Sequence, residues 1–157
     1  MSLSIAKLLT PDLIKLELNE TKRTTAIHEV TLLLSNHPHV KNLDGFYHEI
    51  LERERVEPTC LGNHIAFPHA RTDHIKQIVL AIGRSSKGIL FENANQMIHL
   101  IFVIGTPNRL VTDYLALVGC LARILKEASV REQLLSAATP QDFHHILIEA
   151  EEKMQAG

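Results

Sequence analysis

Two apolar stretches in the middle of the chain set the tightest limit on its fold. The runs QIVLAIGR (77–84) and MIHLIFVIG (97–105) are rich in Ile and Val and are bounded by Gly, Ser and Asn. A membrane-spanning helix needs about 20 apolar residues, so neither run is long enough to cross a bilayer. Short apolar runs without alternation are typical of strands buried on both faces of a sheet. We therefore predict two central strands covered by helices.

Weaker signals for strands and turns surround these two runs. Residues 14–19 alternate apolar and polar side chains, which predicts a half-buried strand. The run HIAF (64–67) predicts a short strand before the two central ones. The polar groups SSKG (85–88) and NANQ (93–96) predict the turns that follow and join the central strands.

Helical periodicity accounts for most of the remaining chain. Apolar residues recur at helical spacing in three segments, 27–34, 43–51 and 110–125. The third segment has so broad an apolar surface that we expect it to pack deep against the sheet. A capping box of Ser129 and Glu132 predicts a short helix, and Thr139 as N-cap with Pro140 at the first helical position predicts the last one.

Taken together, these elements predict a single α/β domain over residues 1–157, with a mixed sheet of about four to five strands sandwiched by helices. Sixteen Lys and Arg against eighteen Asp and Glu give a net charge of −2 with no basic run, so we expect no nucleic-acid partner. Cys60 and Cys120 are isolated, as suits a reducing compartment, and the N-terminal segment lacks a signal-peptide pattern. We expect a cytoplasmic protein without membrane insertion.

The stretch GNHIAFPHAR (62–71) carries the strongest candidate for chemistry. Pro68 has a fixed φ and no N–H, so it stiffens the chain just before His69 and favours an extended Phe67. We expect the His69 side chain at the rim of the sheet, open to solvent. With an ordinary pKa of about 6.5, its imidazole is largely neutral near pH 7 and can act as a nucleophile. From the pattern alone, a histidine in a tight surface turn is an equally good interpretation.

Together with its flanks, this stretch resembles a family of bacterial proteins. ILERERVEPTCL (50–61) precedes it, IVLAIG and NQMIHLIFVIGTP follow it, and REQLLSAATPQDFHHIL lies near the C-terminus. These segments are similar to the enzyme IIA domain of the mannitol–fructose class of the phosphoenolpyruvate-dependent sugar phosphotransferase system, and most of all to its nitrogen-regulatory relatives. The family motif Gly-x-Gly-x-Ala-x-Pro-His is matched at Gly62, Ala66, Pro68 and His69, with the second glycine missing.

The resemblance implies a phosphocarrier without a cofactor. His69 is expected to accept a phosphoryl group from the histidine phosphocarrier protein, and then to pass it to a IIB partner or to use it as a signal toward a regulated target. Arg53 matches the family's arginine, whose guanidinium can bind phosphate oxygens in a bidentate manner. Thr59 lies at a family hydroxyl position near the same pocket. Without the resemblance, Arg53 would be interpreted as a solvated charge on a helix face.

Two positions depart from the family pattern. Where the family usually has a second histidine, this chain has Tyr114. A tyrosine hydroxyl can donate one hydrogen bond but cannot carry positive charge, so Tyr114 is expected to orient His69 or bind phosphate; a core aromatic is the alternative. His64 replaces the missing glycine, and histidine tolerates a positive φ better than most residues. Our hypothesis is that the His64 imidazole returns near His69 and partly replaces the lost partner.

Other classes of site have little support. His64, His69 and His74 lack the spacing typical of zinc ligands, so we expect no metal. There is no P-loop, no G-x-G-x-x-G and no nucleophile elbow, which argues against NTPases, dehydrogenases and hydrolases. The alternative to the phosphocarrier is a regulatory binding module on the same fold, which is not phosphorylated because the two departures have ended phosphotransfer.

Overall fold

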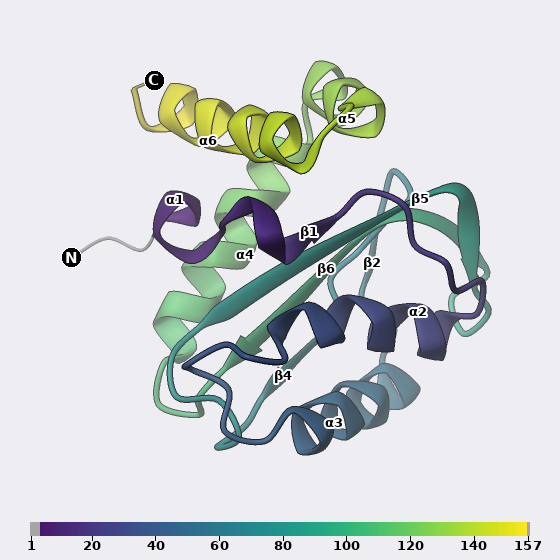
Figure 1. The fold of residues 1–157 in the computed structure, drawn as a ribbon, viewed down its shortest axis with the longest axis vertical. Helices are drawn as coiled ribbons and strands as arrows, with labels where there is room; N and C mark the ends of the chain where they lie inside the picture. The colour runs from purple at the N-terminus through teal and green to yellow at the C-terminus, as the bar shows by residue number, and fades with distance from the viewer. Residues whose placement is uncertain (1–3, 157) are drawn as a thin grey trace.

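The computed structural model describes residues 4–156, which form one mixed six-stranded sheet with helices around it (Figure 1). The strands are β1 (Ile14–Lys15), β2 (Cys60–Gly62), β3 (Ile65–Ala66), β4 (His69–Arg71), β5 (Val79–Phe91) and β6 (Gln96–Thr106). Their order is β1–β5–β6–β3–β2, and β4 also pairs with β6. The predicted α/β class with a mixed sheet is confirmed. The extra strands beyond the four to five expected are pieces of two or three residues.

The centre of the sheet is the antiparallel pair β5–β6, as the two apolar runs predict. Leu80 lies opposite Ile104 and Ile82 opposite Phe102, and all four side chains are fully buried. The turn at Glu92–Asn95 joins the two strands, so the predicted NANQ turn is confirmed. Burial on both faces explains why these strands show no alternation of apolar and polar residues.

The predicted SSKG turn is wrong, because these residues continue β5. The pairing with β6 shifts between Arg84 and Ile89, which marks a bulge within one long strand. Gly88 has φ +86°, a conformation that glycine adopts at little cost, and its N–H donates to Ser85 Oγ at 3.1 Å. The polar letters therefore mark a distortion in the strand rather than its end.

The N-terminal strand is much shorter than predicted. Only Ile14 and Lys15 form β1, parallel to β5. Beyond them, Leu18 N–H still donates to the Arg84 carbonyl of β5 at 2.9 Å and Glu17 accepts hydrogen bonds from Ser86, while the N–H groups of Asn19 and Glu20 donate to the Glu29 carboxylate. These side-chain contacts turn the chain away from the sheet toward the next helix.

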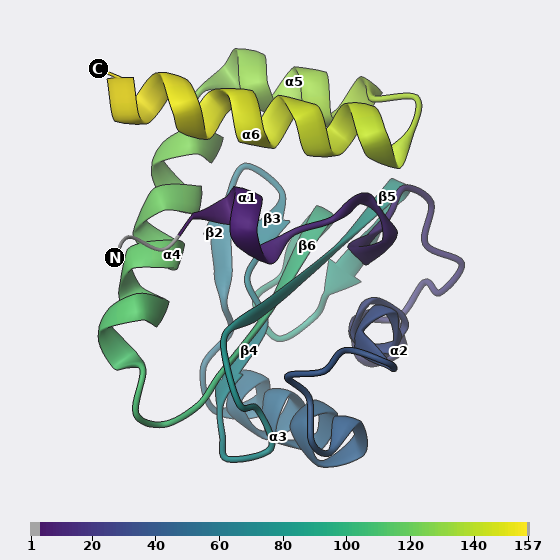
Figure 2. The ribbon, with the colours of Figure 1, turned by 60° about the vertical axis from the view of Figure 1, so that its left-hand side comes forward.

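Helices cover the sheet on different sides (Figure 2). They are α1 (Ile5–Leu8), α2 (Arg23–Thr31), α3 (Leu43–Val56), α4 (Val111–Leu125), α5 (Ala128–Ser136) and α6 (Pro140–Ala156). In Figure 2, α4 lies on one side of the sheet and α2 with α3 on the other, while α5 and α6 lie across one end. At Gly83 in β5, a Cβ would lie 2.5 Å from a methyl carbon of Val30, so glycine lets α2 approach closely. Among residues 4–156, no helix is long and apolar enough to span a membrane.

Three helix predictions differ in outcome. The last helix begins as predicted, because Thr139 Oγ1 accepts from Asp142 N at 3.0 Å and Pro140 follows it. The capping box is wrong: Glu127 is the N-cap of α5, so Ser129 lies inside the helix. The deep packing expected of α4 holds only for its later turns, since Val111 and Leu115 in its first turns are 37% and 60% exposed.

Candidate functional site

His69 begins β4, beside the end of the central strand β6. It pairs in parallel with Ile104, and the carbonyl of Pro68 accepts a hydrogen bond from Ile104 N–H at 3.0 Å. Pro68 has no backbone N–H that would need a hydrogen-bond partner, so the pairing with β6 can begin directly after it, at His69. The backbone on both sides of the imidazole is therefore fixed by the most deeply buried strand pair of the fold.

Both ring nitrogens of His69 have hydrogen-bond partners. Nδ1 lies 2.9 Å from the carbonyl oxygen of Phe67, and Nε2 lies 2.8 Å from Nε of Arg53. A carbonyl only accepts, so Nδ1 carries the proton; the guanidinium only donates, so Nε2 carries the lone pair. The arrangement defines a neutral imidazole with its nucleophilic atom at Nε2, facing a cation.

The helix α3 brings Arg53 to this point. Arg53 lies in the last turn of α3, which packs beside β4. Its carbonyl accepts from Glu57 N–H at 3.0 Å, which closes the end of the helix. Arg53 is partly exposed to solvent, while its Nε–H reaches the imidazole. The remaining guanidinium N–H groups can therefore reach an incoming anion.

Tyr114 packs over the same imidazole from α4. The centroids of the two rings are 5.1 Å apart and their planes are tilted by 32°. Burial raises the pKa of the tyrosine hydroxyl, against the opposing charges of Arg53 and Arg71, so the phenol is neutral near pH 7. Tyr114 thus contacts the ring of His69 and also packs against the edge of the hydrophobic core.

His69 is less accessible than the sequence suggests. Only 8% of the residue is exposed, because Arg53 and Tyr114 cover the ring, so the expectation of an imidazole open to solvent is wrong. Burial lowers the pKa of His69 below its ordinary value of 6.5. The Phe67 carbonyl and Glu57 act in the opposite direction, and Arg53 and Arg71 lower the pKa further. The neutral, nucleophilic form of His69 is therefore favoured.

Arg71 is a second cation at the site, and our sequence reasoning missed it. A pocket of about 320 Å³ beside His69 is lined by Arg53, Arg71 and Asn108 together with Glu49, Glu52 and Glu57. Arg71 follows His69 by two residues on a strand, and residues at this spacing share a face, so the letters HAR contained the signal. One carboxylate is already engaged, because Glu49 accepts a hydrogen bond from Thr72 at 2.6 Å.

Thr59 does not direct its hydroxyl at His69. Its Oγ1 donates to the carboxylate of Glu54, a residue on α3 that is fully buried. The carbonyl of Thr59 accepts from Phe67 N–H at 3.0 Å. The structure therefore connects Thr59 with the segment that carries His69 through the backbone.

The hypothesis that His64 lies near His69 is contradicted. The backbone carbonyls of His64 and Pro68 bond to His99 and Ile104 on β6, about 16 Å apart at about 3.3 Å per residue. His64 Nδ1 instead lies 2.9 Å from the Met97 carbonyl, and its ring packs edge-on against His99. Its φ of +66° explains why glycine suits this position. Of the five predicted site residues, the structure brings His69, Arg53 and Tyr114 into contact.

Comparisons with known proteins agree with this geometry. Residues 7–150 match the family model described as "Phosphoenolpyruvate-dependent sugar phosphotransferase system, EIIA 2". The chain belongs to this enzyme IIA family. A fructose-specific EIIA component of Haloferax volcanii is 33% identical over 92% of this chain and 95% of its own length. A fructose-specific EIIABC component of Bacillus subtilis is 30% identical over 86% of this chain, which spans only 21% of that larger protein.

Solved structures of other enzyme IIA proteins share the fold. The nitrogen regulatory protein IIA-Ntr of Neisseria meningitidis superposes with a TM-score of 0.83, at 24% identity over 91% of this chain and 98% of that one. IIA mannitol of Escherichia coli gives a TM-score of 0.77, at 22% identity over 88% and 98%. These structures confirm the fold, while the family model and the Haloferax volcanii relative confirm the family resemblance predicted from the motif.

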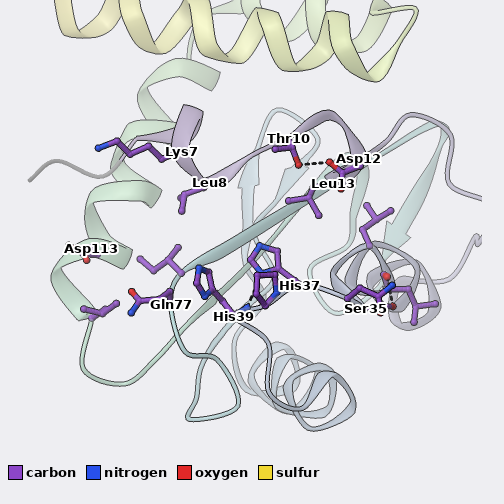
Figure 3. A pocket seen from close by; sticks show the side chains of 16 residues that line it. Lys7, Leu8, Thr10, Asp12, Leu13, Ser35, His37, His39, Gln77 and Asp113 are labelled. Atoms are coloured by element: carbon purple, nitrogen blue, oxygen red, sulfur yellow. Dashed lines mark hydrogen bonds between the residues drawn. The ribbon is translucent and has the colours of Figure 1, made fainter.

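A larger cavity than the pocket beside His69 lies elsewhere in this enzyme IIA chain. It has a volume of about 630 Å³ and is lined by segments that include His37, His39 and Gln77, with Asp113 of α4 and its N-cap residue Leu110 (Figure 3). It shares no lining residue with the pocket beside His69. Within residues 4–156, no group of three or more His, Cys, Asp or Glu side chains is placed to bind a metal ion.

Proposed function

We propose that this enzyme IIA chain is a phosphocarrier and that Nε2 of His69 accepts the phosphoryl group. The observation that carries the proposal is the pair of contacts on the imidazole, Nδ1–H to the Phe67 carbonyl and Arg53 Nε–H to Nε2. The first contact fixes the tautomer, and the second places a cation where phosphoryl oxygens would arrive. A surface histidine in a turn requires neither contact.

In the proposed reaction, the lone pair of His69 Nε2 attacks the phosphorus of a phosphohistidine donor. The new Nε2–P bond forms as the P–N bond to the donor breaks, and the donor imidazole keeps that electron pair. The Nδ1 proton remains on His69, bonded to the Phe67 carbonyl, so the positive charge of the phosphoimidazole ring moves from donor to acceptor. Transfer of this kind depends on alignment and charge stabilisation rather than on further covalent chemistry.

Arg53 and Arg71 are proposed to bind the transferred group. Arg53 must exchange its bond to Nε2 for bonds to phosphoryl oxygens, a change that needs only a small shift of an exposed side chain. Arg71 and Asn108 line the adjoining pocket and supply further donors. Tyr114 packs over the face of the ring, so it lies outside the in-plane direction in which the Nε2 lone pair points. Thr59 supports the site from a distance.

The donor we propose is the histidine phosphocarrier protein, and the recipient is a IIB domain or a regulated target. Similarity to fructose- and mannitol-specific components supports a IIB domain as the recipient. Similarity to a nitrogen regulatory protein of Bradyrhizobium diazoefficiens, at 24% identity, supports a regulated target. A solved complex joins enzyme IIA mannitol of Escherichia coli with its phosphorylated IIB. In the regulatory case, about −1.5 to −2 of added charge at His69 would alter a protein interface.

A non-phosphorylated binding module on the same fold is the second candidate. The observation that favours it is the closed site, since Tyr114 covers an imidazole that is only 8% exposed. The polar contacts on both nitrogens of His69 favour the phosphocarrier instead, because a pure binding module has no need to fix a tautomer.

One experiment separates the two candidates. The protein is incubated with phosphoenolpyruvate, enzyme I and the histidine phosphocarrier protein, and its intact mass is measured before and after brief acid treatment. We expect an acid-labile gain of one phosphoryl group, which His69→Ala abolishes. His145→Ala is the matched control, because this exposed helical histidine lies on α6 and pairs with Glu149 of the same helix. No gain under conditions that phosphorylate another enzyme IIA protein would establish the binding module.

A further inference from the structure

Glu54 is a buried acid that the proposed reaction does not use. It is fully buried on α3, next in sequence to Arg53. Burial raises the pKa of its carboxyl group, against smaller opposing effects of Thr59, Arg23 and Arg53. Among residues 4–156, its Oε1 atom has no hydrogen-bond partner. Burying a carboxyl group with one unbonded oxygen costs free energy of folding. We therefore expect Glu54 to have a role that offsets this cost.

A chain of hydrogen bonds leads from this acid to the imidazole. Thr59 Oγ1 donates to Oε2 of Glu54, and the Thr59 carbonyl accepts from Phe67 N–H at 3.0 Å. The Phe67 carbonyl in turn accepts from Nδ1–H of His69 at 2.9 Å. Every link joins a donor to an acceptor, so the series runs without interruption from Glu54 to the ring.

The end of α3 is therefore linked by hydrogen bonds to both nitrogens of His69. Arg53 reaches Nε2 directly, while Glu54 reaches Nδ1 through Thr59 and Phe67. Consecutive helical residues point about 100° apart, which allows one of the pair to face the site and the other to face the core. The helix end is itself anchored, because Asn93 Nδ2 donates to the Glu54 carbonyl at 2.9 Å.

We propose that Glu54 and Thr59 are positioning residues that hold His69 in the tautomer with its lone pair on Nε2. They touch neither the phosphoryl group nor the reacting atom. Their effect is to keep the 57–60 segment, and with it the Phe67 carbonyl, at a fixed distance from Nδ1. Without this anchor the Phe67 carbonyl shifts, the bond to Nδ1 lengthens, and the other tautomer, which has its lone pair away from Arg53, becomes populated.

Thr59→Val and Thr59→Ser test this assignment as a matched pair. Valine keeps the shape of threonine but cannot donate to Glu54, whereas serine keeps the hydroxyl. ¹⁵N NMR of the unphosphorylated, histidine-labelled protein reports the tautomer directly. We expect wild type and Thr59→Ser to show one protonated Nδ1 on His69, and Thr59→Val to show a mixture of both tautomers.

The second readout is the rate of phosphorylation, and only this readout depends on the proposed function. We expect that rate to fall at least fivefold in Thr59→Val and to change less than twofold in Thr59→Ser. Glu54→Gln should match wild type in both readouts, because its amide oxygen can still accept from Thr59. If Thr59→Val does not fold, Thr59→Ala replaces it.

A folded Thr59→Val or Thr59→Ala protein with wild-type ring signals would overturn the positioning role, whether or not the chain is a phosphocarrier. If the tautomers mix as expected but no variant, including wild type, is phosphorylated, the positioning role stands and the proposed function fails.

Discussion

The phenol ring of Tyr114 packs on the imidazole of His69, with 5.1 Å between the ring centroids. Burial is the largest cause of the lowered His69 pKa, and Tyr114 supplies part of that burial. We expect Tyr114→Ala to raise the His69 pKa toward its ordinary value of 6.5, and Tyr114→Phe to leave it nearly unchanged. NMR titration of the imidazole measures both. Equal midpoints in wild type and Tyr114→Ala would contradict the covering role.

Arg53 should be the residue least tolerant of substitution after His69 itself. A hydrogen bond to a charged group contributes about 1.5–3 kcal/mol, so its loss in the transition state slows transfer by about ten- to a hundredfold. Lysine lacks the planar fork of donors, so we expect Arg53→Lys to fall in this range too. Single-turnover phosphorylation measures the rate.

Arg55→Lys is the control for Arg53, because Arg55 is exposed and pairs with Glu52 on the surface of the same helix. We expect its rate to stay within about twofold of wild type, since exposed ion pairs contribute little. Equal effects at both positions would remove any special role from Arg53.

The lowered pKa of His69 has a consequence for stability. The unfolded chain takes up a proton at this residue near pH 6.5, whereas the folded chain resists protonation until lower pH. The stability that neutral His69 contributes is therefore present above pH 6.5 and is lost as pH falls below it. We expect His69→Gln to lose less unfolding free energy than wild type between pH 7.5 and pH 5.5, as measured by urea titration. An identical pH dependence would show that the pKa is not lowered.

His64→Gly should leave phosphorylation unchanged within about twofold, because His64 lies far along β6 from the acceptor. Its stability should change little. Glycine relieves a left-handed backbone that costs about 1–2 kcal/mol, but it loses the bond to the Met97 carbonyl, worth about 1 kcal/mol. Parallel rate and urea measurements check both statements. A slower rate without loss of stability would restore a role for His64 in the site.

Sequence alone predicted the parts of the fold that depend on local pattern. The β5–β6 pair was evident because continuous apolar runs require burial, and the start of α6 because Thr139 and Pro140 form a local cap. The HIAF run predicted β3, but β2 and β4 were not evident, since two or three residues become a strand only when a pairing strand, here β3 or β6, is beside them. The polar residues 85–88 fit a turn by local pattern, but pairing with β6 on both sides of them keeps them within β5 as a bulge.

The site was predictable only where a motif names a residue. His69 and Arg53 came from the family pattern, and their contact is confirmed by the structure. Glu54 was hidden, because in the letters ERER it looks like one more solvated charge. Its burial depends on how α3 packs against the neighbouring elements, which no local pattern records. His64 was misplaced because closeness in sequence along an extended chain means separation in space.

The central claim is that Nε2 of His69 is the phosphoryl acceptor, and ¹⁵N NMR of the phosphorylated protein tests it most directly. With histidine nitrogens labelled, the account predicts a phosphorus coupling on Nε2 of His69 alone, with Nδ1 still protonated. A phosphoryl group on Nδ1, or on any other histidine, would contradict it.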